Sequence, residues 1–393
     1  MQKLFVFNPG HEEALLHHSA SSYTPRQEVR QLMYDLGHLM LLLCDEGDYV
    51  ALITEEGLCI IDHLSNPVSP QDLPPLELTP WALEPHLIAY IAKHATVLGI
   101  SLSLPFVSRP YLSLSHRSSS TRLLHYLIEQ GWNVEDLIPE WLHASEDLSL
   151  ELDRCLTGFM TQGHLRLIAK RPFSSSGRGV MPIDLPADAA CRKMLFGQCC
   201  RSGSISLEPW LQIEQDWAVE YYYSSEGARY IGLSRFDTKR DLATYEGNQL
   251  ASETELRGEI IRHIGQESWE RLIEGHRAFL AAELGETYIG YIGVDMCLYK
   301  QGKELRLHPA VEINVRCTMG LLAHEAYLRY IEPMLYDDTT RVRYRFQLDY
   351  YPEKGAAFQS YLAHLRTEPS PPSFIPLTKP TQNSHYYTYL TPR

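Results

Sequence analysis

The sequence has few of the features that mark disulfide-rich, zinc-binding or membrane-embedded proteins. Its 8 cysteines form no Cys-x-x-Cys pair, and only Cys199 and Cys200 are adjacent. Free thiols in a reducing compartment fit this pattern better than disulfides or zinc, so we expect a cytoplasmic protein. The apolar run from Leu39 to Cys44 is too short to cross a membrane, and we expect no signal segment.

Positive charge is also scarce. The chain has 35 Lys and Arg residues against 49 Asp and Glu residues, which gives a formal net charge of −14. A surface of this sign does not attract nucleic acid or anionic membrane, and we expect neither as a partner. A small polyanion such as a nucleotide would need a local site. Homo-oligomerisation stays open.

The common nucleotide-binding and zinc-protease motifs are absent. There is no GxxxxGK[ST] loop and no GxGxxG motif, so neither a P-loop nor a Rossmann fold is supported. The segment His11-Glu12-Glu13 lacks the HExxH spacing, because Leu15 stands where the second histidine would be required. With His17 and His18 it leaves two readings open: a metal site, or a polar loop and helix start that faces a substrate.

The opening residues predict a small α/β domain. With 393 residues, 44% hydrophobic and 21% charged, the chain has the composition of a globular protein of two or three domains. Leu4–Phe7 and Tyr49–Ile53 have the composition of strands, and Thr24-Pro25 begins a capping box before an apolar helix face. Thr79-Pro80 predicts a second helix start, before Trp81.

The most informative stretch is Ala310–Arg316, where polar and apolar residues alternate as in a strand. Its predicted partner is Ile292–Tyr299. If Asp295 lies opposite Glu312, the hairpin turn falls inside Gln301–Glu304, which contains a glycine.

In that register, one face of the hairpin carries Asp295, Glu312, Asn314 and Arg316. The oxygens of the first three suit a hard cation, and the guanidinium suits a phosphate beside it. Pro309 cannot donate a ladder hydrogen bond, so this end of the strand must be an edge or a bulge.

A second informative stretch runs from Lys170 to Val180. Its serines and glycines allow either a phosphate-binding loop or a plain flexible hairpin. Farther along, Ser206–Leu211 is predicted to be a strand interrupted by proline. The interruption would free backbone groups to bind an adenine edge, or the segment would simply connect two domains. Thr244–Asn248 is predicted to be an exposed loop.

The order of these features resembles that of the ATP-grasp superfamily, over roughly Ser118 to Ala326. The resemblance implies an α+β fold in which two α+β lobes hold ATP, preceded by a small α/β pre-ATP-grasp domain. The corresponding division is residues 1–110 for that first domain, 111–205 for the first lobe with its phosphate loop, 206–336 for the second lobe with the Mg/ATP site, and 337–393 for a C-terminal extension.

The resemblance also implies roles for individual residues, with ATP and Mg²⁺ as cofactors and Mn²⁺ as an alternative metal. In the family's pattern, a strand lysine and a small-residue loop hold the phosphates, a hinge reads adenine, an acidic residue takes the ribose, and a final group binds metal and phosphate. The matching positions are Lys170; Ser174, Ser175, Ser176, Gly177 and Arg178; Glu208, Pro209, Trp210 and Leu211; Asp216; and the metal ligands Asp295, Glu312 and Asn314. Lys170, Asn314 and Arg316 would be catalytic. One departure is Arg117, in a region where many relatives have a lysine.

The implied activity is that of a carboxylate-amine ligase. Such an enzyme activates a carboxylate as an acyl phosphate, which an amine or another nucleophile attacks, and it releases ADP. Its partners would be a small-molecule carboxylate and a small-molecule nucleophile. The alternative is a non-catalytic or regulatory ATP-binding protein of the same fold.

Overall fold

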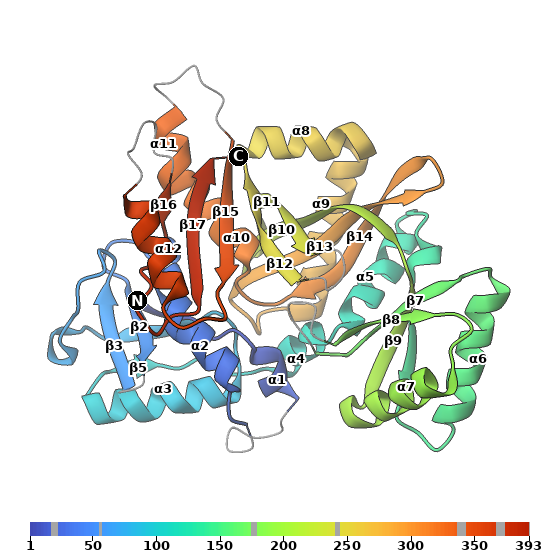
Figure 1. The fold of residues 1–393 in the computed structure, drawn as a ribbon, viewed down its shortest axis with the longest axis horizontal. Coiled ribbons are helices and arrows are strands. Elements are labelled where there is room, and N and C mark those ends of the chain that lie inside the picture. The colour runs from blue at the N-terminus through green and yellow to red at the C-terminus, as the bar shows by residue number, and fades with distance from the viewer. Residues whose placement is uncertain are drawn as a thin grey trace.

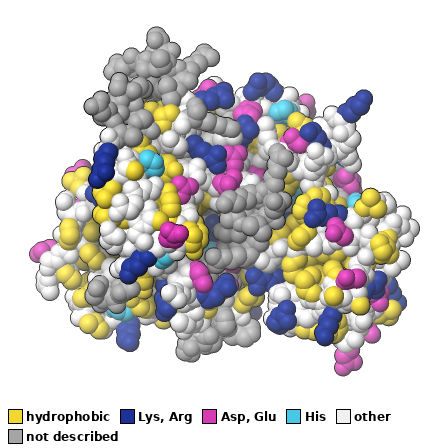
Figure 2. Space-filling model, in the orientation of Figure 1, with side chains coloured by type: hydrophobic (Ala, Val, Ile, Leu, Met, Phe, Trp, Pro, Cys, Tyr) yellow, Lys and Arg dark blue, Asp and Glu magenta, His cyan; other side chains and the backbone are white. Residues whose placement is uncertain are grey.

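The computed structural model describes residues 1–16, 23–54, 57–173, 179–239, 244–335, 343–366 and 374–392. These residues form a mixed α/β structure with a five-stranded, a four-stranded and an eight-stranded sheet (Figure 1). No helix in this part of the chain is long and apolar enough to cross a membrane. Lys and Arg side chains and Asp and Glu side chains are interspersed over the face seen in Figure 2.

The five-stranded sheet is built from the N-terminal residues. Its order is β3-β2-β1-β4-β5, and β1 runs parallel to both of its neighbours. The strands are β1 (Gln2–Val6), β2 (Tyr49–Thr54), β3 (Gly57–Asp62), β4 (Leu76–Pro80) and β5 (Leu102–Ser103); the helices are α1 (His11–Leu15), α2 (Gln27–Leu36), α3 (Pro85–Leu98) and the 3₁₀ segments η2 (Gly37–Leu43) and η3 (Pro70–Asp72). The predicted strand, helix, strand order is confirmed.

Both predicted helix starts in this region are wrong. α2 begins at Gln27 without a side-chain cap, not at Thr24-Pro25. Thr79 and Pro80 pair with β1 as the end of β4. The following helix starts at Pro85, where the carboxylate of Glu84 accepts the backbone N–H groups of His86 and Leu87.

The four-stranded sheet is antiparallel, with the order β6-β9-β7-β8 (green, right of Figure 1). It packs against two helices around its own apolar cluster, which includes Leu156, Leu167, Leu195 and Leu207. The elements are β6 (Glu140–His143), α6 (Leu148–Thr161), β7 (Arg166–Lys170), β8 (Val180–Asp184), α7 (Ala189–Ser202) and β9 (Ser204–Pro209).

The eight-stranded sheet has the order β14-β13-β10-β11-β12-β15-β17-β16. Its strands are β10 (Gln212–Ser224), β11 (Gly227–Lys239), β12 (Thr244–Leu250), β13 (Gly290–Gln301), β14 (Glu304–Asn314), β15 (Tyr344–Tyr350), β16 (Ile375–Pro376) and β17 (Tyr386–Pro392). The remaining helices are α4 (Arg109–Ser115), α5 (Ser118–Glu129), η4 (Glu135–Leu137), α8 (Glu253–Ile264), α9 (Gln266–Leu284), α10 (Met319–Ala326), the π segment η5 (Tyr327–Ile331), α11 (Glu332–Leu335) and α12 (Ala356–Leu365). The division of the chain at residues 110, 205 and 336 stays a prediction.

One face of this sheet packs against helices. Trp217, Val219 and Tyr221 alternate along β10 and are fully buried, in one cluster with side chains of α5, α8 and α9. Because side chains alternate across a strand, the residues between them point to the other face. That second face carries the polar residues described below.

The segment Thr244–Asn248 is a strand, so the predicted exposed loop is wrong. It lies in β12, which pairs with β11 on one side and β15 on the other. Asn248 is almost fully buried.

Two glycines on helices provide a test of the packing. A Cβ on Gly320 in α10 would overlap the side chains of Glu220 and Ser234, whereas a Cβ on Gly158 in α6 would meet nothing within 4 Å. We expect Gly320→Ala to lower the free energy of unfolding by about 1–3 kcal/mol. Gly158→Ala should raise it by about 0.5–1 kcal/mol through helix propensity. Urea unfolding measures both, and equal effects would contradict the close packing of α10 on the sheet.

Candidate functional site

The hairpin of β13 and β14 has the predicted register. Asp295 pairs with Glu312, and the strands turn between Gln301 and Glu304, where Gly302 has a φ of 65°. The register shifts between Asp295 and Cys297, and β14 is the edge strand of its sheet. Pro309 was expected to require an edge strand or a bulge, and the strand has both.

Three cross-strand rows lie on the second face of the sheet, and most of their residues are buried. Each row combines one residue of β10 with its partners on β13 and β14. The rows are Asp216, Cys297 and His308; Ala218, Asp295 and Glu312; and Glu220, Gly293 and Asn314. Four of the predicted site residues, Asp216, Asp295, Glu312 and Asn314, are thus on one surface.

Hydrogen bonds join two of the predicted metal ligands, Asp295 and Asn314, to the predicted phosphate arginine, Arg316. Asn314 Nδ2 donates to Asp295 Oδ2 at 3.0 Å, and Arg316 Nη2 donates to Asn314 Oδ1 at 2.7 Å. Burial, and then the neighbouring charge of Glu312, raise the pKa of Asp295 to about 7. The Asn314 amide therefore sits between a carboxyl group and a guanidinium, and it orients both.

Arg316 is held at the junction with the N-terminal sheet. Its Nε donates to Glu12 Oε1 at 3.3 Å, and its Nη1 donates to the carbonyl oxygen of Cys317 at 3.0 Å. With the bond to Asn314, the described contacts engage three of the five N–H groups of a guanidinium, which leaves two for an anion. The backbone N–H of Cys317 donates to the carbonyl of Trp81 at 2.9 Å, which fixes this turn against the end of β4.

The segment with two open readings begins α1. His11 and Glu12 are buried, with His11 Nδ1 3.2 Å from Glu12 Oε2. Burial lowers the pKa of His11 to about 4, so its imidazole is neutral at pH 7. Glu12 contacts Arg316, which agrees with a polar helix start that faces a ligand site; His17 and His18 lie outside the described residues.

Lys170 and Glu208 form a buried ion pair in the four-stranded sheet. Lys170 Nζ lies 2.5 Å from Glu208 Oε2, and Ser206 Oγ donates to Glu208 Oε1 at 2.9 Å. Burial alone would raise the pKa of Glu208, but the charge and hydrogen bond of Lys170, with Arg117 and Ser206, hold it below its usual value. Burial, and then the charge of Lys170, lower the pKa of His308 to about 4, so the Lys170 charge lies near the first of these rows.

The predicted hinge connects the four-stranded sheet to the eight-stranded sheet. Pro209 ends β9, β10 starts at Gln212, and Trp210 and Leu211 lie between them. Trp210 is 37% exposed, and the guanidinium carbon of Arg166 lies 4.0 Å from the centre of its ring. Asp216 follows on β10; it accepts a hydrogen bond from Thr238 Oγ1 at 2.9 Å, and burial raises its pKa to about 6.

The predicted phosphate loop cannot be placed. Ser174, Ser175, Ser176, Gly177 and Arg178 lie outside the described residues. Their roles stay predictions.

Two residues at the site, Arg117 and Glu220, were not predicted from the sequence in the roles that the structure gives them. Arg117 stands out in the sequence only as a departure from the lysine of many relatives, and no sequence pattern indicates its partner. Its Nη1 and Nη2 lie 2.9 Å from the two oxygens of Glu312. Glu220 was overlooked, although the period-two pattern of its strand puts it on the face of Asp216. It accepts hydrogen bonds from Thr318 Oγ1 at 2.8 Å and Ser234 Oγ at 3.4 Å, and burial raises its pKa to about 8.

The donor set fits a hard cation that arrives with a ligand. Asp295, Glu312 and Asn314 offer carboxylate and amide oxygens, and Mg²⁺ usually binds one or two carboxylates together with substrate phosphates. In the described part of the chain, no three or more His, Cys, Asp and Glu side chains are grouped so that they could hold a metal ion. The site therefore suits a metal shared with a phosphate better than a structural metal.

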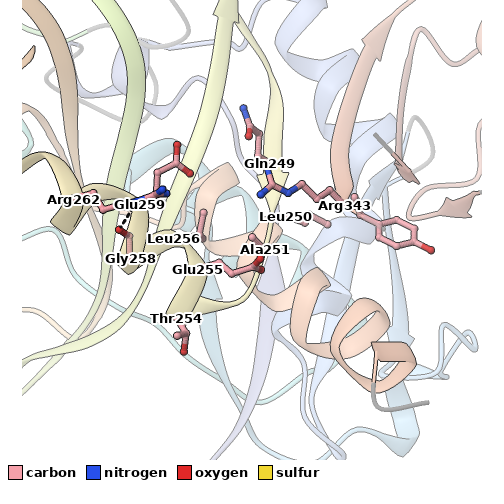
Figure 3. Close-up of a pocket in the computed structure, with 11 residues that line it drawn as sticks. Gln249, Leu250, Ala251, Thr254, Glu255, Leu256, Gly258, Glu259, Arg262 and Arg343 are labelled. Atoms are coloured by element: carbon pink, nitrogen blue, oxygen red, sulfur yellow. Dashed lines mark hydrogen bonds between the residues drawn. The ribbon is translucent and has the colours of Figure 1, made fainter. Parts of the chain in front are cut away.

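A pocket of about 250 Å³ lies elsewhere, between α8 and the strands β12 and β15 (Figure 3). None of the predicted site residues that the structure describes line it. Its lining is Gln249, Leu250, Ala251, Thr254, Glu255, Leu256, Gly258, Glu259, Arg262, Arg343 and Tyr344.

No protein-family model matches the chain, and no curated protein matches it. Solved structures do. An N5-carboxyaminoimidazole synthase from Aspergillus clavatus, in complex with ADP and 5-aminoimidazole ribonucleotide, is 13% identical, with 100% of this chain and 94% of that chain covered and a TM-score of 0.47. An N5-carboxyaminoimidazole synthetase from Staphylococcus aureus complexed with ADP is 9% identical, with 100% and 93% covered and a TM-score of 0.48. A biotin carboxylase from Campylobacter jejuni is 12% identical, with 81% and 71% covered and a TM-score of 0.48.

The raised pKa of Glu220 predicts a pH-dependent stability. Its folded pKa of about 8 exceeds the ordinary value of 4.5, so its stabilising contribution is complete below pH 4.5 and is lost as the pH rises through 8. The Gln side chain of Glu220→Gln stays neutral at every pH. The difference in free energy of unfolding, variant minus parent, should therefore rise by about 2–4 kcal/mol between pH 5 and pH 9. Urea unfolding across that range measures this.

Glu274→Gln is the matched control, because Glu274 is an exposed residue of α9. It should keep the pH profile of the parent. A Glu220→Gln profile parallel to that of the parent would show that Glu220 titrates normally in the folded protein.

Proposed function

We propose that the chain is an ATP- and Mg²⁺-dependent ligase of the ATP-grasp superfamily. It activates a carboxylate as an acyl phosphate for attack by an amine or another nucleophile, and it releases ADP. The observation that carries the proposal is the shared face of Asp295, Glu312 and Asn314, with Arg316 bonded at its end and the Lys170–Glu208 pair beside it. Positive groups and oxygen ligands so arranged suit a triphosphate and its metal.

The residues take the following roles. The hinge at Pro209, Trp210 and Leu211 would hold adenine through its backbone, and Asp216 would accept a ribose hydroxyl. Lys170 and the two remaining N–H groups of Arg316 would bind the β- and γ-phosphate oxygens. Mg²⁺, held by Asp295, Glu312 and Asn314, would supply further positive charge to these oxygens.

In the first step, a carboxylate oxygen of the substrate attacks the γ-phosphorus. The bond from this phosphorus to the β,γ-bridging oxygen breaks, and ADP leaves. In the second step, the nucleophile attacks the acyl carbon, inorganic phosphate leaves, and an amine nucleophile loses a proton to solvent. The protein provides positioning and charge, and no side chain needs to act as a nucleophile.

Trapping of the acyl phosphate tests the reaction. With ATP, Mg²⁺, hydroxylamine and pools of amino acids, peptides and small carboxylates, we expect a hydroxamate and ADP, with no AMP. AMP and pyrophosphate would place the attack on the α-phosphorus. Saturable ATP binding without turnover across the whole panel would favour the non-catalytic ATP-binding protein.

The role of Lys170 is best tested in a pair of substitutions. Loss of Lys170 alone would leave the buried Glu208 carboxylate unpaired, at a cost of about 3–5 kcal/mol. Lys170→Met with Glu208→Gln removes both charges, so the fold should persist while kcat/KM falls by roughly 100-fold or more, because a donor to developing charge is lost. Lys193→Met changes an exposed lysine of α7 in the same lobe and should keep the activity of the parent. Full activity in the double variant would exclude Lys170 from phosphate binding.

A further inference from the structure

The ion pair of Arg117 and Glu312 lies inside the site. The side chain of Arg117 is only 6% exposed and that of Glu312 24% exposed, and the fork of the guanidinium matches both carboxylate oxygens at 2.9 Å. A bidentate pair of this kind is among the strongest polar contacts in proteins. Glu312 is one of the two predicted carboxylate ligands of the metal, so a cation already neutralises the position that the metal would use.

Arg117 is fixed in place by more than this pair. Its Nε donates to the carbonyl oxygen of Arg171 at 3.2 Å, and its backbone N–H donates to the carbonyl oxygen of Pro172 at 2.9 Å. It directly precedes α5, a helix that packs against β14. One residue thus connects the chain just after Lys170 to the strand of the metal ligands.

A divalent cation cannot share Glu312 with this guanidinium at low cost. The metal would have to displace a charge-assisted pair, or bind next to a buried positive charge. A phosphate group can replace the carboxylate as the partner of Arg117, because guanidinium binds phosphate in the same bidentate manner as carboxylate. If the guanidinium of Arg117 moved from Glu312 to a phosphate, both carboxylate oxygens of Glu312 would become available to the metal. The phosphate oxygens would be available to the metal at the same time.

We propose that Arg117 occupies the cation position at Glu312 in the nucleotide-free protein and that nucleotide phosphates draw it away, so metal binds with the nucleotide and not before it. The inference rests on the proposed function in taking Asp295 and Glu312 as metal ligands. It assigns Arg117 as a positioning residue that couples metal binding to nucleotide binding.

The test is Mn²⁺ binding to the full-length protein, followed by electron paramagnetic resonance or calorimetry, without nucleotide and with saturating ADP. Without nucleotide, Arg117→Met should bind Mn²⁺ at least about tenfold more tightly than the parent, because a neighbouring positive charge is gone. With saturating ADP, the Mn²⁺ affinities of the variant and the parent should agree within about threefold, because Arg117 has then left Glu312 in the parent. The same variant should bind ADP more weakly, and a purely structural ion pair would not move the two affinities in opposite directions.

Arg122→Met is the matched control. Arg122 lies on α5, the helix that Arg117 precedes, and forms its own two-pronged pair with Glu283, at 3.2 Å and 2.6 Å. This pair is not part of the site. The Arg122→Met variant should have the same affinities for Mn²⁺ and for ADP as the parent. Arg117→Met combined with Glu312→Gln should lose the gain in Mn²⁺ affinity, which would show that the gain acts through Glu312.

Arg117→Lys is a second variant that is less disruptive to the fold. It keeps the positive charge at position 117 but cannot form the bidentate pair with Glu312. It should bind Mn²⁺ more tightly than the parent and less tightly than Arg117→Met. The inference is overturned if neither variant binds Mn²⁺ more tightly than the parent without nucleotide, or if no protein binds Mn²⁺ even with ADP. A gain in Mn²⁺ affinity without ligase turnover would support the inference and count against the proposed activity alone.

Discussion

The antiparallel pairing of β13 with β14 is the constraint on which the site depends. It places Asp295 opposite Glu312 and Gly293 opposite Asn314, and a shift by one residue would turn all of these polar groups into the apolar core. The opposite face prevents that shift, because Val294 and Ile313 are paired and buried there. The same apolar packing that stabilises the sheet therefore also aligns the candidate ligands.

Around this hairpin, the charged groups are arranged in chains of contacts that cross from one part of the fold to another. One chain runs from Asp295 through Asn314 and Arg316 to Glu12 on α1, and another joins Glu312 through Arg117 to the residues that follow Lys170. A ligand that displaces one partner would therefore also affect its neighbours. In the proposed function, these contacts would couple the binding of nucleotide, metal and substrate in one site.

Sequence reasoning succeeded where a local pattern determines the outcome. Alternating polarity and a short turn were enough to predict the pairing of Asp295 with Glu312. The helix starts at Thr24 and Thr79 were wrong because capping is a weak local preference, and Thr79 is instead fixed by pairing with Phe5 on β1. Thr244–Asn248 looked like a loop from its Gly and Asn, yet two neighbouring strands hold it in the sheet. The contacts Glu12–Arg316 and Arg117–Glu312 join residues 304 and 195 positions apart, and no local pattern predicts them.

In the proposed function, the second face of the large sheet and Lys170 together hold a metal nucleotide. A crystal structure with Mn²⁺ and a non-hydrolysable ATP analogue tests it most directly, because the anomalous signal of the metal locates it independently of the nucleotide. We expect Mn²⁺ between Asp295 and Glu312, phosphates in contact with Lys170 and Arg316, and adenine at Trp210 and Leu211. A nucleotide bound elsewhere, for example in the pocket beside α8, or a metal without contact to either carboxylate, would contradict it.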